Sequence, residues 1–188
     1  MEAKKLKTVN DLLLSEDERV ELIDGEILQR TLPRFEHGAV QSKTWGEILP
    51  YNKKSYFDGG WWIVTEVSVR YNEHQCPCHD LAGWRKDRVP NMPKGVTDIK
   101  PDWVCEIISP GHENKDTVHN FLLLQSYQVP YYWIIYPEDK TIITYILVDS
   151  KYKVDFSIQC KEEKDLKKVN IAPFEEVNID LSYVFEGL

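Results

Sequence analysis

The chain has 188 residues, of which 42% are hydrophobic and 29% are charged, so we expect residues 1–188 to form a single globular domain with a sizeable core. Its net charge of −8 argues against a protein that coats nucleic acid through overall positive charge, but does not exclude a local basic strip. No apolar run approaches the roughly 18–20 residues that span a bilayer, and the charged N-terminus has no apolar signal core, so we expect a cytoplasmic protein with no membrane association.

Helical periodicity and capping signals predict four helices, the first two very short. They cover residues 11–14, 15–22, 37–49 and 116–127. Runs rich in β-branched and aromatic residues between turn signals predict strands. These cover residues 26–31, 61–71, 79–84, 103–108, 131–136, 141–148 and 151–158. This order indicates an α/β (α+β) domain with a mixed sheet and packed helices, including one crossover between parallel strands over residues 103–136.

Three further segments complete the chain. Side chains along residues 61–71 alternate regularly between the two faces of a strand. We expect one face of the sheet to carry the side chains at the odd positions, namely Trp61, Ile63, Thr65, Val67 and Val69. Residues 85–100 form a loop rich in Lys and Arg, which is either a nucleic-acid-binding strip or an ordinary solvated loop. Residues 161–168 are expected to be a solvated connection, and the last twenty residues to be strand or turn material that closes the domain.

Two acidic residues interrupt apolar strands. Glu106 lies in the middle of the strand over residues 103–108, which prolines bracket, and Asp80 lies between Cys78 and Leu81. A carboxylate on a strand that is buried on both faces must be paired or bound to something. Two such acids can seat a hard divalent cation, Mg²⁺ or Mn²⁺. The alternative is that a neighbouring Arg, Lys or backbone group satisfies each acid.

The four cysteines are too few and too unevenly spaced for a disulfide framework. His74, Cys76, Cys78 and His79 lie within six residues of one another and raise the alternative of a structural zinc site. Their spacing leaves little room for a tetrahedral cage, and no second pair of ligands lies nearby. Zinc is therefore the weaker of the two metal hypotheses.

Several motifs follow one another in a characteristic order. They are VELIDGE at residues 20–26, Pro33 and His37 before a helix, the lone Asp80, PDWVCEIISP at residues 101–110, Asp116, and VPYYWII at residues 129–135. In order and spacing, this set resembles the Uma family of bacterial restriction-endonuclease-like proteins, from about residue 18 to residue 148. Each motif alone is a weak signal, and their combination carries the resemblance.

The resemblance implies the PD-(D/E)xK nuclease fold, a central mixed β-sheet flanked by helices. It also implies a metal-dependent endonuclease that hydrolyses phosphodiester bonds of DNA and acts as a homodimer. Asp80 and Glu106 stand at the positions of the two metal-binding acids, and Glu21 at that of a helix-borne acid that faces the same site. His37 matches a histidine near the mouth of the cleft, but we expect it to be a helix N-terminal cap or a surface residue.

The sequence departs from the family pattern at the lysine of the site. The position two residues after Glu106 is Ile108, and the position on the following helix where the family carries its lysine is Asn120. Asparagine donates a hydrogen bond but has no charge with which to stabilise a developing anion. Lys115 is a candidate substitute. Because Leu124 and Tyr136 also depart from the pattern, the alternative function is a catalytically degenerate member that binds a nucleic acid or a protein.

Overall fold

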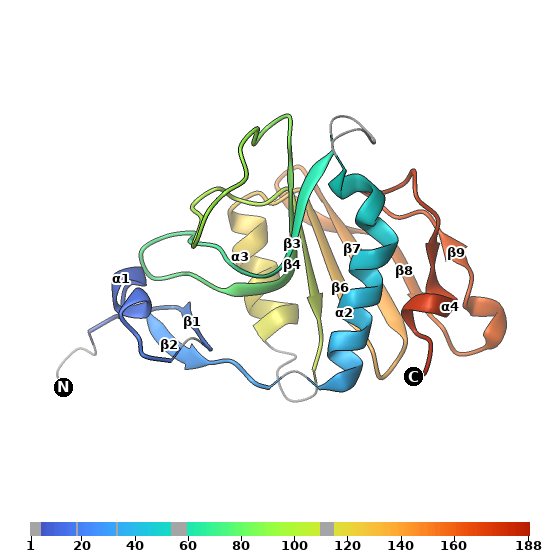
Figure 1. Ribbon diagram of the computed structural model, residues 1–188, viewed down its shortest axis with the longest axis horizontal. Helices are drawn as coiled ribbons and strands as arrows, with labels where there is room; N and C mark the ends of the chain where they lie inside the picture. Colours follow the sequence, from blue (N-terminus) through green and yellow to red (C-terminus); the bar gives the residue numbers. More distant parts are fainter. Residues whose placement is uncertain (1–4, 18, 33, 54–59, 110–114) are drawn as a thin grey trace.

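The computed structural model describes residues 5–17, 19–32, 34–53, 60–109 and 115–188. A six-stranded mixed sheet forms its centre, in the spatial order β3-β4-β5-β6-β7-β8 (Figure 1). Its strands are β3 (Trp61–Ser68), β4 (Cys78–Arg85), β5 (Trp103–Ile107), β6 (Tyr131–Tyr136), β7 (Thr141–Val148) and β8 (Lys151–Gln159). Neighbouring strands are antiparallel except β5 and β6, which are parallel as the predicted crossover requires.

Helices cover both faces of this sheet (Figure 1). α2 (Phe35–Ile48) packs on one face, and α3 (Phe121–Ser126) packs on the other after a π-helical segment, η2 (Lys115–Asn120). Within β5, Trp103 and Cys105 belong to the core cluster on the α2 side, whereas Val104 belongs to the cluster on the α3 side. A strand covered on both faces is apolar along its length. The predicted fold class, a mixed sheet flanked by helices, is confirmed.

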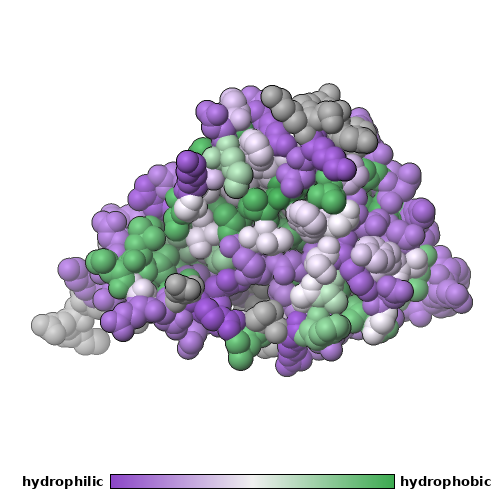
Figure 2. Space-filling model, viewed as in Figure 1, coloured by the Kyte–Doolittle hydropathy of each residue, from purple (hydrophilic) through white to green (hydrophobic). Residues whose placement is uncertain are grey.

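Shorter elements surround the sheet. At the N-terminal end, α1 (Val9–Leu13) precedes an antiparallel hairpin of β1 (Val20–Ile23) and β2 (Glu26–Gln29). The remaining ones are η1 (Leu49–Asn52), η3 (Glu163–Asp165), β9 (Lys168–Val169), β10 (Ile179–Asp180) and α4 (Leu181–Val184). Figure 2 shows that hydrophilic side chains cover most of the face in view. Among the described residues, no helix is long and apolar enough to cross a membrane.

The predicted helical turn over residues 15–22 is wrong, since none of the described residues in this range is helical. Val20–Ile23 is strand β1, because it pairs with β2 across a tight turn at Asp24 and Gly25. Both turn residues have positive φ angles, 49° and 72°, and such a turn matches the twist of a hairpin. Glu18, on which the helical prediction depended, lies outside the described residues, as does Pro33.

The expected alternation along residues 61–71 is also wrong beyond its midpoint. Trp61 and Ile63 lie in the core cluster on the α2 side, but Val69 lies in the cluster on the α3 side and Val67 packs against that cluster. Between them, Glu66 has a φ of 50°, in the left-handed region that residues with a side chain rarely adopt. This one residue exchanges the two faces of the strand.

Candidate active site

Asp80 and Glu106 lie where β4 and β5 separate. The backbone pairing of these strands ends at Leu81 and Cys105. Beyond that pair, the backbone N–H of Ile107 donates to Asp80 Oδ2 at 2.8 Å, and the backbone N–H of Asp80 donates to Glu106 Oε2 at 3.2 Å. Each carboxylate thus replaces a missing ladder partner on the neighbouring strand. This reciprocal arrangement holds both acids in one fork of the sheet.

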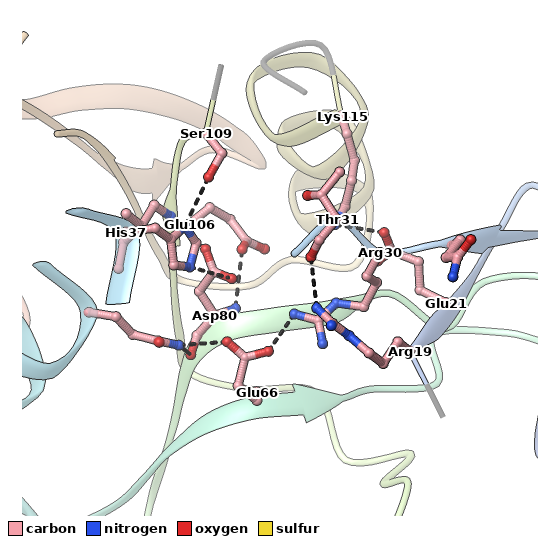
Figure 3. A pocket seen from close by; sticks show the side chains of 13 residues that line it. Arg19, Glu21, Arg30, Thr31, His37, Glu66, Asp80, Glu106, Ser109 and Lys115 are labelled. Atoms are coloured by element: carbon pink, nitrogen blue, oxygen red, sulfur yellow. Dashed lines mark hydrogen bonds and ion pairs between the residues drawn. The ribbon is translucent and has the colours of Figure 1, made fainter. Parts of the chain in front are cut away.

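The fork opens into a cavity of about 360 Å³ (Figure 3). Both acids line it, and so do three cationic side chains, those of Arg19, Arg30 and Lys115. Arg19 donates to the backbone carbonyl of Thr31 at 3.1 Å, which keeps its guanidinium at the β1–β2 side of the cavity. A cavity with buried acids at its base and cations along its wall can hold both a metal ion and an anionic substrate.

Glu106 is 1% exposed and tightly hydrogen-bonded. Its Oε1 lies 2.6 Å from His79 Nδ1 and accepts a hydrogen bond from Asn120 Nδ2 at 3.0 Å. Burial and then the negative charge of Asp80 raise the pKa of Glu106 well above its ordinary value. Burial and then the charge of Lys115 lower the pKa of His79 to about 3, so the imidazole is neutral near pH 7. The other ring nitrogen of His79 lies 2.9 Å from the hydroxyl of Tyr71.

Asp80 faces the opposite side of the fork, toward α2. Its Oδ1 lies 3.5 Å from His37 Nε2, and His37 Nδ1 lies 3.2 Å from Ser109 Oγ. His37 is 9% exposed, so the expectation of a cap or surface residue is wrong. Burial opposes the charged imidazolium, but the hydrogen bond and charge of Asp80 outweigh it and raise the pKa of His37.

Glu66 is a residue of this site that sequence reasoning did not single out. Its position in β3 is opposite Asp80, between the pairs Thr65–Leu81 and Val67–His79. Arg30 forms an ion pair with the Glu66 carboxylate, and Gln41 of α2 donates to it at 2.8 Å (Figure 3). Glu66 is the single charged residue among the eight of β3, the same signal that pointed to Glu106. That signal was available in the sequence.

The other predicted site residues also converge here. Glu21 is 4% exposed, accepts the backbone N–H of Cys78 at 3.2 Å, and lies 2.8 Å from Lys115 Nζ. It is carried by strand β1, so the prediction of a helix-borne acid is wrong about the element. Lys115 lines the cavity, whereas Asn120 is fully buried behind Glu106.

The segment from His74 to His79 does not assemble a zinc site. His74 Nδ1 lies 2.7 Å from the backbone carbonyl of Lys7, and His79 is occupied by Glu106 and Tyr71. Burial raises the pKa of the Cys76 thiol to about 11 and that of Cys78 to about 12, which disfavours the thiolates that bind zinc. Within the described ranges, the group of three donors close enough to share a cation is His37, Glu66 and Asp80.

The basic loop after β4 is largely engaged locally. Arg88 forms an ion pair with Asp102 at 2.8 Å, and Arg85 one with Asp87 at 3.3 Å. Lys86 lies over the ring of Trp62, 4.3 Å from its centroid. These contacts favour the interpretation of residues 85–100 as an ordinary loop.

A mixed sheet flanked by helices, with two buried acids in a strand fork, defines a restriction-endonuclease-like fold. The sequence model of the Uma2 family, described as "Putative restriction endonuclease", matches residues 6–172, and the chain belongs to this family. A crystal structure from Anabaena variabilis, described as "a putative nuclease belonging to DUF820", is similar to this chain with a TM-score of 0.72 and 24% identity. The match covers 95% of this chain and 97% of that one, so the two share their fold. No curated protein matches the chain.

Proposed function

We propose that this protein is a DNA endonuclease that hydrolyses phosphodiester bonds with the help of Mg²⁺ or Mn²⁺. The observation that carries the proposal is the reciprocal fork of Asp80 and Glu106 at the base of a cavity with cationic walls. Membership of a family described as "Putative restriction endonuclease" supports the same reaction class. A homodimer would present one such site to each strand of a duplex, so the proposal includes a homodimer.

The donor atoms of the fork fit a hard divalent cation. Carboxylate oxygens are the ligands that Mg²⁺ and Mn²⁺ prefer, and Asp80 presents Oδ1 toward the cavity while Oδ2 is held by a backbone N–H. Such a cation supplies Lewis-acid chemistry, activating water and offsetting charge on the phosphate. Asp80 is the central ligand in this proposal, and Glu106 supports it by accepting its backbone N–H.

In this proposal, Lys115 takes the role of the missing lysine. Its side chain is 25% exposed and lines the cavity, where its ion pair with Glu21 orients it. We assign to Lys115 the stabilisation of negative charge that develops on the phosphate. Asn120 has a different task, since its amide holds Glu106 from the buried side.

A catalytically degenerate protein that only binds nucleic acid or a protein is the second candidate. The observation that favours it is Asn120, which places a neutral amide beside Glu106 where the family has a lysine. Under this alternative the cavity still binds a metal or a phosphate, but the protein cleaves DNA slowly or not at all.

A plasmid-cleavage assay over a series of divalent metals separates the candidates. We expect weak cleavage with Mn²⁺ that Asp80→Asn abolishes. Asp102→Asn is the matched control, because Asp102 is equally buried but pairs with Arg88 away from the cavity. Asn120→Lys should raise the rate.

The outcomes of this assay are distinct. Cleavage by Asn120→Lys but not by the native chain would favour the degenerate alternative. Cleavage that survives Asp80→Asn, or its absence from every variant with every metal, would overturn the proposed endonuclease. Light scattering during size-exclusion chromatography tests the homodimer separately.

A further inference from the structure

Three donor groups from separate elements converge on the α2 side of the fork. They are His37 of α2, Glu66 of β3 and Asp80 of β4, whose ligand atoms all lie within 4.8 Å of one another. Two ligands on perpendicular bonds of about 2.1 Å to one ion lie about 3 Å apart. The separation of 3.5 Å between His37 Nε2 and Asp80 Oδ1 is close to that value. To close around one ion, the group must contract from 4.8 Å, and a Glu66 oxygen must exchange its contact with Arg30 or Gln41 for the ion.

The face exchange at Glu66 explains why these groups meet. Asp80 lies opposite Glu66 and contacts His37 of α2. Strand alternation would place Asp80 on the same face of β4 as Ala82 and Trp84, but those two residues lie in the cluster on the α3 side. Both acids therefore point toward α2, where Gln41 holds them together. Its amide donates at 2.8 Å to the Glu66 carboxylate and also at 2.8 Å to the backbone carbonyl of Asp80.

Glu106 is turned the other way. Its Oε1 is shared by His79 and Asn120, and its Oε2 accepts the backbone N–H of Asp80. It does not belong to the three-donor group, although it lines the same cavity. The space beside Asp80 Oδ1 is instead bordered by a nitrogen donor, the imidazole of His37.

We propose that the cation of this site is held by Asp80, His37 and Glu66, and that the imidazole makes the site select Mn²⁺ over Mg²⁺. This inference rests on the proposed function for its setting, and it names the ligands and the metal preference of that same site. Mg²⁺ favours oxygen ligands and retains its waters, whereas Mn²⁺ and later transition metals accept imidazole nitrogen. The buried setting of His37 and its contact with Ser109 fix the ring in place for this task.

The test measures metal binding without DNA, so it does not depend on cleavage. Free Mn²⁺ in solution is followed by its electron paramagnetic resonance signal, and Mg²⁺ by competition with Mn²⁺. We expect the native chain to bind Mn²⁺ at least about tenfold more tightly than Mg²⁺, and His37→Gln to weaken Mn²⁺ binding by about 10- to 100-fold. Glu66→Gln should weaken it as well. His37→Asp, which makes all three donors oxygens, should erase most of the preference for Mn²⁺.

His74→Gln is the matched control, because His74 also contacts a neighbouring group but lies away from the cavity. Its affinity for Mn²⁺ should equal that of the native chain, and thermal melting checks that each variant is folded. If Asp80→Asn abolishes Mn²⁺ binding but His37→Gln and His37→Asp do not change it, the ion is held by Asp80 without His37. That result overturns the inference and leaves the proposed endonuclease intact. If the native chain binds no Mn²⁺, the contact of His37 with Asp80 is a plain ion pair, and the inference also fails.

Discussion

The buried contacts from Tyr71 through His79 to Glu106 predict the effect of removing a single hydroxyl group. Tyr71→Phe keeps the aromatic ring and its packing against Tyr127, whose centroid is 5.1 Å away. It removes only the oxygen that lies 2.9 Å from His79 Nε2. His79 Nδ1 remains 2.6 Å from Glu106 Oε1, so the imidazole keeps one of its two partners.

The expected cost follows from burial. His79 is 0% exposed, so water cannot replace the lost hydroxyl. A buried polar group without a partner costs about 1–3 kcal/mol, and we therefore expect the free energy of unfolding to fall by about 2 kcal/mol. Tyr152→Phe is the control, since it removes a hydroxyl that donates to the backbone carbonyl of Val129 at 2.8 Å in a less buried setting. We expect that change to cost about 1 kcal/mol.

Urea denaturation followed by tryptophan fluorescence measures both losses. The two variants should differ further in metal affinity, because only Tyr71→Phe loosens the ring that holds Glu106 in the fork. A loss of less than about 0.5 kcal/mol for Tyr71→Phe would refute the reasoning, because a typical net hydrogen bond is already worth that much. It would mean that His79 does not depend on the hydroxyl.

Two other predictions concern the acids of the site. The left-handed φ at Glu66 costs a residue with a side chain about 1–2 kcal/mol and costs glycine almost nothing. After the entropic cost of glycine is subtracted, Glu66→Gly should be about 1 kcal/mol more stable than Glu66→Ala. Urea denaturation of the two variants measures this difference. Equal stability would contradict the strain at this position. For Glu106, the raised pKa means that the folded protein keeps its proton to higher pH than the unfolded chain, so stability falls as the pH rises above the ordinary value of 4.5. Glu106→Gln should remove this contribution, so that in metal-free buffer the variant gains stability relative to the native chain as the pH rises above 4.5. A difference that does not change with pH would show that Glu106 is not protonated in the fold.

The sequence by itself determined the local elements and the two acids of the fork. An apolar strand with one carboxylate has few physical solutions, so Glu106 and Asp80 could be singled out before any contact was known. Turn chemistry acts over a few residues, which is why the strand that follows the turn at Asp24 and Gly25 could be predicted. The same local signals failed at residues 15–22, where pairing with β2 outweighed a capping pattern.

Only the tertiary structure decided which other groups share the cavity. Glu66 and His37 are separated by almost thirty positions in the chain, and periodicity describes the faces of one element without saying which faces meet. The exchange of faces at Glu66 depends on its positive φ. The sequence did not predict this conformation, because glutamate seldom adopts a positive φ. Likewise, the sequence presents Asn120 as a replacement of the lysine, but packing of η2 against the sheet makes it the amide that holds Glu106. Strand alternation is a local property, whereas the fork, its buried hydrogen bonds and its open side arise when distant strands and helices pack together.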